Sequence, residues 1–222
     1  NVLECAEEML SITVQDYVTR KIKVFGTRPY KNTRDDVEYI LCDSEEHLLR
    51  AFLDHWVQNF PDILTGWNVE LYDVPYICGR LERLFGTKEM KLMSPWNIVH
   101  DDEIEIKGRK NKVYNIYGIN VMDYMDLYKK FTYTNQESYR LDHIAHVELG
   151  QRKLDHSEHE NFKAFYTNDW QKFIDYNIID TELVVRLEEK MKLIELAVAL
   201  AYDAKVNVRD VYYQVRMWDT LI

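Results

Sequence analysis

The order in which two hydrophobic periods follow one another limits the folds open to this chain more than any other feature. Polar and apolar residues alternate over residues 11–15 and 21–25, as in two strands joined by a polar turn. From Asp169 almost to the end, apolar residues instead recur at helical spacing. Between these stretches the two patterns take turns, with strand-like residues 63–67 and 119–123 and helix-like residues 43–56, 74–86, 124–131 and 138–147. Strands first, then an alternation, then helices predict a single layered α/β domain.

A long hairpin is predicted over residues 98–117. Alternating apolar residues flank the polar residues 107–112, which include a glycine suited to a turn. This turn is the most basic stretch of the sequence, and charge runs of this kind usually mean a solvated surface.

Composition excludes several classes of protein. Of the 222 residues, 46% are hydrophobic, and 4 prolines with 7 glycines are too few for a disordered or collagen-like chain. The net charge of −10 argues against a domain that grips nucleic acid by bulk positive charge. It leaves room for clustered carboxylates, which are the usual ligands of Mg²⁺ or Mn²⁺.

The cysteines and the chain ends indicate the setting. Cys5, Cys42 and Cys78 form no C-x-x-C pair, which argues against a disulfide framework or a cysteine zinc site and favours a reducing, cytoplasmic setting. No apolar run approaches the ~20 residues of a membrane helix. The sequence opens on Asn1 rather than Met and closes on an apolar stretch, so we expect both ends to be cuts within a longer protein.

Two aspartates stand where packing alone would not place an acid. Asp73 follows bulky apolar residues at the junction of a predicted strand and helix, which predicts a partly buried charge at a helix N-terminus. A plain helix N-cap is the alternative. Asp180 lies on the apolar stripe of a predicted helix, one turn after Tyr176 on the same face. A divalent metal would satisfy this carboxylate, and so would backbone donors or an arginine.

Two motifs resemble exonuclease motifs of family B DNA polymerases. Asn-x-x-x-Tyr-Asp from Asn68 to Asp73 resembles the second motif, and Tyr-x-x-x-Asp from Tyr176 to Asp180 resembles the third. Residues 123–131 and 205–222 are similar to the replicative polymerases of tailed bacteriophages in particular. The resemblance implies an α/β fold of the ribonuclease H-like kind, a mixed sheet flanked by helices with a protruding β-hairpin. It also implies a proofreading domain that removes mispaired 3′ nucleotides with two divalent ions.

The resemblance also implies roles for the motif residues. Asp180 would ligate the metal that activates water, and Asp73 would serve a second metal near the leaving oxygen. Tyr176 would orient the attacking water. Asn68 would hold the terminal nucleotide by a hydrogen bond and Tyr72 would hold it by ring packing.

Further DNA contacts follow from the same resemblance. Leu141, preceded by Arg140 where the family has Ser or Thr, would touch single-stranded DNA. Lys153 matches a lysine near the scissile phosphate, and an exposed, solubilising lysine is the alternative. The basic turn at residues 107–112 resembles the loop that helps to separate primer from template.

The sequence departs from the family at its first motif. Nothing before residue 11 reads Asp-x-Glu, the pair that supplies acids shared by the metals. Asp101 to Glu103 has the spacing but follows the second motif. We therefore expect the fragment to lack the first strand of its sheet and half of its metal cage, and to cleave single-stranded DNA little by itself.

The domain organisation and partners complete the expectations. Residues 1–200 would form a partial exonuclease domain, and residues 201–222 a helical exit toward a polymerase domain of the same protein. Partners would be the 3′ end of single-stranded DNA, that polymerase domain and a sliding clamp, with Mg²⁺ or Mn²⁺ as cofactor, in the host-cell cytoplasm. The alternative is a non-catalytic, exonuclease-like module that shapes the polymerase or partitions strands.

Overall fold

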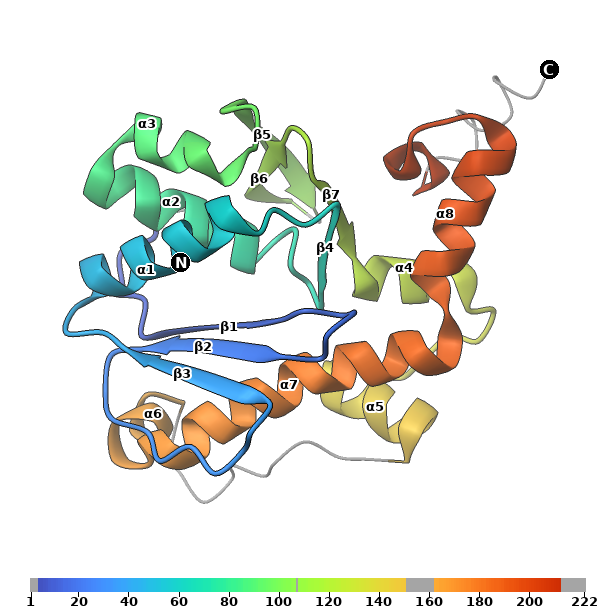
Figure 1. Ribbon diagram of the computed structural model, residues 1–222. Helices are drawn as coiled ribbons and strands as arrows, with labels where there is room; N and C mark the ends of the chain where they lie inside the picture. The colour runs from blue at the N-terminus through green and yellow to red at the C-terminus, as the bar shows by residue number, and fades with distance from the viewer. Residues whose placement is uncertain (1–3, 107, 151–161, 213–222) are drawn as a thin grey trace. The chain divides into compact units, whose positions relative to one another are not determined.

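The computed structural model describes residues 4–106, 108–150 and 162–212 and shows a mixed α/β protein (Figure 1). The chain divides into two compact units. Unit 1 takes the described residues of Asn1–Glu7, Trp56–Glu137 and Glu188–Ile222, and unit 2 those of Glu8–His55 and Ser138–Leu187. The strands pair into three small sheets, β1-β2-β3, β4-β7 and β5-β6.

Unit 2 joins one three-stranded sheet to helices that come from both halves of the chain. Its elements are β1 (Ser11–Gln15), β2 (Ile22–Gly26), β3 (Val37–Leu41), most of α1 (Glu45–Gln58), α5 (Leu141–Leu149), α6 (Phe162–Asn168) and α7 (Trp170–Met191) as far as Leu187. The predicted hairpin is confirmed, because β1 and β2 pair antiparallel. The third strand was not predicted, and it runs parallel to β2.

The link between β2 and β3 is a loop held on α7. The hydroxyl of Tyr30 donates to the carboxylate of Asp175 at 2.6 Å, and the guanidinium of Arg34 pairs with Glu182 at 2.5 Å. Parallel strands usually need a helical crossover between them. Here the crossover is a loop, and a hydrogen bond and an ion pair tie it to α7.

One cluster of the described core of unit 2 lies between the sheet and helices α6 and α7. Its buried members are Ile22, Val24, Val37, Phe165, Trp170, Phe173, Ile174 and Ile178. Helix α1 follows its predicted pattern: Ser44 accepts a hydrogen bond from the backbone N–H of His47 at 3.2 Å, as an N-cap does, and Leu48, Leu49 and Phe52 are buried.

Unit 1 carries the two remaining sheets. Its elements are β4 (Ile63–Gly66), α2 (Asp73–Phe85), α3 (Thr87–Met90), η1 (Lys91–Met93), β5 (Val99–Ile106), β6 (Arg109–Ile116), β7 (Asn120–Asp123), α4 (Tyr124–Phe131), α8 (Leu193–Ala204) and η2 (Val208–Tyr212). Strands β4 and β7 are parallel, and their last residues, Gly66 and Asp123, are register partners. The segments that follow these two strands therefore leave from the same edge of the sheet.

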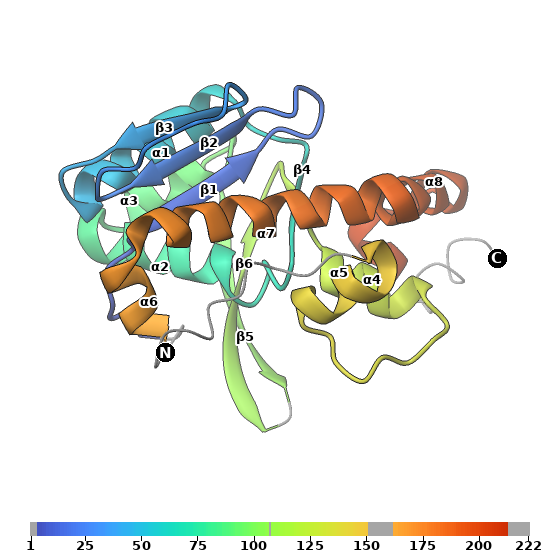
Figure 2. The same cartoon turned by 90° about the horizontal axis from the view of Figure 1, so that it is seen from below.

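The predicted long hairpin is confirmed as antiparallel β5 and β6, and Figure 2 shows it as a two-stranded arm. From His100 to Ile106 every residue of β5 is exposed. Position 107 in the turn lies outside the described residues.

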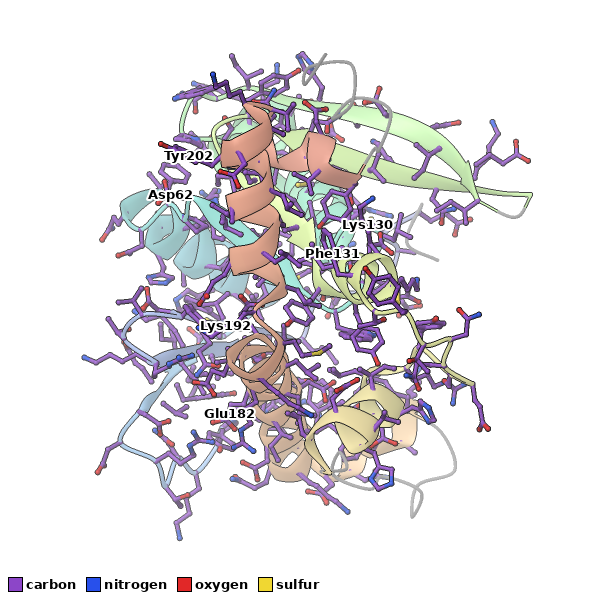
Figure 3. All side chains as sticks on the ribbon, turned by 90° about the vertical axis from the view of Figure 1, so that its right-hand side faces the viewer. Asp62, Lys130, Phe131, Glu182, Lys192 and Tyr202 are labelled. Atoms are coloured by element: carbon purple, nitrogen blue, oxygen red, sulfur yellow. The ribbon has the colours of Figure 1, made fainter. Side chains whose placement is uncertain are left out.

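The long helical pattern after Asp169 is interrupted at Lys192, where the structure differs from the prediction (Figure 3). Lys192 has a left-handed backbone with φ 54°, so α7 ends and α8 begins there. The buried carboxylate of Glu188 accepts the backbone N–H groups of Ile194 and Glu195 at 3.1 and 3.3 Å and the hydroxyl of Tyr124 at 3.0 Å. An acceptor inside the helix pattern thus satisfies donors that the break exposes.

The last predicted segment is only partly within the described chain. Helix α8 ends at Ala204, and η2 covers part of the predicted amphipathic segment at residues 211–222. Residues 213–222 lie outside the described residues. Among the helices that the structure describes, none has the length and the apolar character needed to cross a membrane.

We expect Gly118→Ala to destabilise the chain more than Gly86→Ala. The two glycines have nearly equal φ values, 91° and 89°, so a side chain adds similar backbone strain at both. An added Cβ at Gly118 would stand 2.5 Å from Pro95 Cγ, whereas at Gly86 it would meet nothing within 4 Å. The difference should be about 1 kcal/mol or more in the free energy of unfolding from urea denaturation. Equal losses would show that the Pro95 contact relaxes without cost.

Candidate functional site

The segment between β4 and α2 carries the first group of predicted site residues. Gly66 permits a tight turn, because a Cβ there would lie 3.1 Å from the Cβ of Val69. Asn68 has a left-handed backbone, with φ 63°, a conformation that asparagine tolerates better than most residues. The turn brings the backbone of Asn68 and Glu70 back to the end of the neighbouring strand β7.

Asp123 ends β7 and holds this turn. One of its carboxylate oxygens, Oδ1, accepts the backbone N–H of Asn68 at 3.1 Å and that of Met125 at 2.9 Å, and Oδ2 accepts the N–H of Glu70 at 3.1 Å. The bond to Met125 makes Asp123 the N-cap of α4. Only 2% of Asp123 is exposed. Burial raises its pKa from the ordinary 3.8 to about 6, and nearby Asp126 acts in the same direction against the three N–H donors.

Asp73 and Tyr72 lie at the start of α2. Asp73 is the first helical residue and it is exposed, so the prediction of a partly buried charge is wrong. The N-cap position belongs to Tyr72, so the interpretation of Asp73 as a plain cap is also wrong. A carboxylate in the first turn is favoured by the helix dipole, and solvent exposure leaves it accessible. Tyr72 is 59% exposed.

Tyr176 and Asp180 lie on α7 in unit 2, at the predicted spacing of one turn. Both residues are half-buried, and the Oδ1 atom of Asp180 is inaccessible to solvent. The ring of Tyr176 packs edge-on against Phe165, with centroids 5.8 Å apart. Asp73 belongs to unit 1, so the cooperation of Asp73 and Asp180 around metal ions stays a prediction.

Of the other two predicted DNA contacts, Leu141 and Lys153, only Leu141 lies within the described residues. Leu141 begins α5 after Arg140 and is only 6% exposed, whereas Arg140 is exposed. Lys153 lies outside the described residues. The roles of Leu141 and Lys153 stay predictions.

The described lysines of the basic hairpin are paired with acids on the facing strand. Lys112 lies 2.9 Å from Asp101 and Lys110 lies 3.2 Å from Glu103, and in both pairs the acid is two positions away from the register partner of the lysine. The Lys112 ammonium beside Asp101 lowers the pKa of that carboxyl. The acids of residues 101–103 thus belong to the hairpin arm, and two of them, Asp101 and Glu103, pair with its lysines, which reduces the net positive charge along β6.

Residues of η2 contact the β4–α2 segment, β6 and α4. The guanidinium of Arg209 binds the carboxylate of Glu70 at 2.8 Å and the side-chain oxygen of Asn115 on β6. Lys130 of α4, labelled in Figure 3, donates to the carbonyl of Tyr212 at 3.1 Å. Burial raises the pKa of the Tyr212 phenol, and the negative charges of Asp123 and Glu70 add to this effect.

The side chains of Asp73 and Asp180 suit a divalent ion in kind. Carboxylate oxygens are the ligands that Mg²⁺ and Mn²⁺ prefer. Within residues 4–106, 108–150 and 162–212, no three His, Cys, Asp or Glu side chains are grouped closely enough to hold a metal ion. The two aspartates are therefore candidate ligands that would need further donors.

Sequence reasoning did not single out Asp123, Glu70 and Arg209 as part of the site. An aspartate between a predicted strand and a predicted helix is a recognisable N-cap signal, so the helix contact of Asp123 could have been found. Its bonds to the backbone of Asn68 and Glu70 span 55 and 53 positions and leave no local signal.

The chain matches a known family over most of its length. Residues 4–144 match the model of the DNA polymerase family B exonuclease domain, and the chain belongs to this family. The mixed α/β structure is consistent with the fold of such a domain.

Similar proteins are viral polymerases. The DNA-directed DNA polymerases of Escherichia phage RB69 and Enterobacteria phage T4 are each 37% identical to the chain over 188 residues, which cover 85% of the chain and 21% of each polymerase. The DNA polymerase of Bombyx mori nuclear polyhedrosis virus is 29% identical over 72% of the chain and 16% of that protein. The chain thus spans about a fifth of the length of the phage polymerases it matches.

We expect Asp123→Asn to reduce the pH dependence of stability between pH 5 and 7. The folded state raises the pKa of Asp123, so it binds the proton more tightly than the unfolded state does. The resulting stabilisation is complete below the unfolded pKa and is lost as the pH rises through about 6. On acidification from pH 7 to 5 the wild type should gain about 1 kcal/mol relative to the variant in urea denaturation. The exposed Asp203 supplies the control Asp203→Asn, and identical pH profiles of wild type and Asp123→Asn would contradict the expectation.

Proposed function

We propose that the chain is the 3′-5′ exonuclease domain of a viral family B DNA polymerase, which removes mispaired 3′-terminal nucleotides from single-stranded DNA. The observation that carries this proposal is the match of residues 4–144 to the exonuclease domain of that family. The two phage polymerases at 37% identity support it. The mixed α/β structure supports a ribonuclease H-like fold for the intact domain.

The motif residues would share the work of binding and positioning. Asn68 and Tyr72 would hold the 3′-terminal nucleotide, by hydrogen bonding and by ring packing. The exposure of Tyr72 leaves its ring free to meet a base. Leu141 would touch the unpaired strand and Lys153 would lie near the scissile phosphate.

The carboxylates would bind the metal cofactor. Asp73 and Asp180 would hold Mg²⁺ or Mn²⁺, which when bound lower the pKa of water and stabilise the charge that develops on the 3′ oxygen. Tyr176, one helical turn before Asp180, would orient the attacking water through its hydroxyl. Its packing on Phe165 supports this role, because a ring held in one place aims its hydroxyl reproducibly.

The surroundings of the domain follow from the same proposal. Residues 1–200 would form the exonuclease part and residues 201–222 would lead toward the polymerase domain of the whole protein. A sliding clamp would be a further partner, and the host-cell cytoplasm the place of action. The phage relatives, which are DNA-directed DNA polymerases, support the link to a polymerase domain.

The roles of the aspartates can be tested in a complete polymerase that contains this chain. Asp180→Ala and Asp73→Ala should each remove most 3′-5′ trimming of a labelled single strand while primer extension continues. Removal of a residue that hydrogen-bonds to a metal ligand typically lowers metal affinity or activity about 10- to 100-fold. Removal of the ligand itself should lower the trimming rate further. Single-turnover rates in Mg²⁺ measure the effect.

Asp203→Ala, which removes an exposed carboxylate from α8, is the matched control and should trim like the wild type. Wild-type trimming by Asp180→Ala would contradict the assigned role. A wild-type polymerase that extends primers but trims no 3′ end would instead favour a non-catalytic module.

A further inference from the structure

The β4–α2 segment has no regular structure of its own, although two proposed nucleotide contacts lie in it and one proposed metal ligand follows it directly. It contains Asn68 and Tyr72, and it ends where Asp73 begins α2. Its shape includes a positive φ at Asn68, a conformation that asparagine tolerates better than most residues but that still costs more than it would for glycine. Such a backbone persists only where neighbouring groups hold it.

Asp123 supplies that restraint from the adjacent strand. Its two oxygens accept the N–H groups of Asn68 and Glu70 on one side and that of Met125 on the other. A single buried carboxylate thereby joins the end of β7, the start of α4 and the β4–α2 segment. Two of the three donors belong to the segment, and they bond to different oxygens of the carboxylate, so the segment is held at two points.

Aromatic packing also connects the β4–α2 segment to α4. Trp67, which precedes Asn68, lies against Tyr124 and Tyr128 of α4, with ring centroids 6.4 and 6.2 Å apart. The helix that receives Trp67 is the one that Asp123 caps.

The ion pair between Glu70 and Arg209 is a weaker support. The side chains of Arg209 and Glu70 are 39% and 29% exposed. Partly exposed pairs contribute little because solvent screens them. Asp123, at 2% exposure, is therefore the residue on which the segment depends.

We propose that Asp123 is a positioning residue for the exonuclease reaction, because its carboxylate sets the backbone from which Asn68, Tyr72 and Asp73 reach substrate and metal. This inference rests on the proposed function. It assigns to Asp123 no contact with DNA or with a metal. Asp123 would act on the reaction through the β4–α2 segment. A change at Asp123 should therefore lower the trimming rate fully only while the residues of that segment are intact.

Asp123→Asn is the sharpest change, because asparagine has the same shape but only one acceptor oxygen. Its NH₂ group would face a backbone N–H that needs an acceptor, so either the Glu70 bond or the Asn68 and Met125 bonds would be lost. In the complete polymerase, the single-turnover rate of 3′ trimming at saturating DNA should fall on the order of 100-fold, as for a reacting group misplaced by about 1 Å. Rates are taken at a temperature where far-UV circular dichroism shows the variant folded, with primer extension as an internal control.

Two comparisons separate positioning from simple destabilisation. Asp126→Asn removes a neighbouring, half-exposed acid that pairs with Lys129, and it should trim like the wild type. In a chain that already carries Asn68→Ala, Asp123→Asn should lower the trimming rate by a much smaller factor than it does in the wild type. The effects of two residues on a rate do not add when one acts through the other.

The outcomes are distinct for the two proposals. A wild-type rate for Asp123→Asn, or full additivity with Asn68→Ala, would overturn the positioning role while leaving the exonuclease proposal in place. A wild-type polymerase that extends primers but trims no 3′ end would instead contradict the proposed function.

Discussion

A buried carboxylate at the end of a short strand organises the part of unit 1 that carries the candidate site. Asp123 cannot leave its oxygens unsatisfied at 2% exposure, and the three N–H groups that it accepts come from Asn68, Glu70 and Met125. Asp123 thus binds the backbone of the β4–α2 segment and caps α4, the helix against which Trp67 packs. The parallel register of β4 and β7 makes the arrangement possible, because both strands end at the same edge.

A buried carboxylate also accepts backbone N–H groups at the break between α7 and α8. Glu188 is buried within a helical pattern and accepts N–H groups of Ile194 and Glu195 that the break at Lys192 would leave without helical partners. In both places the acid lies among apolar residues in the sequence, and backbone N–H groups donate hydrogen bonds to its carboxylate. A buried carboxylate in such a chain is therefore weak evidence of a metal ligand until its hydrogen bonds are known.

Most of the regular structure was predictable from local patterns. The β1–β2 hairpin, α1, α2, the β5–β6 arm and α4 follow from periods of two and 3.6 residues and from turn or cap residues nearby. Strand β3 was not predicted, since its place beside β2 depends on contacts such as Tyr30 with Asp175, far away in the sequence. The exposure of Asp73 was also mispredicted, because apolar neighbours in sequence do not determine which side of a helix start faces solvent.

The sequence by itself determined the candidate chemistry: the spacing from Asn68 to Asp73 and the helical spacing of Tyr176 and Asp180 are local, and they led to the family that residues 4–144 confirm. Only the tertiary structure decided how the first of these motifs is held. The bonds from Asp123 and the ion pair from Arg209 join residues more than 50 positions apart in sequence. Periodicity and propensity act over a few residues, whereas such contacts exist only after strand pairing has brought distant segments together.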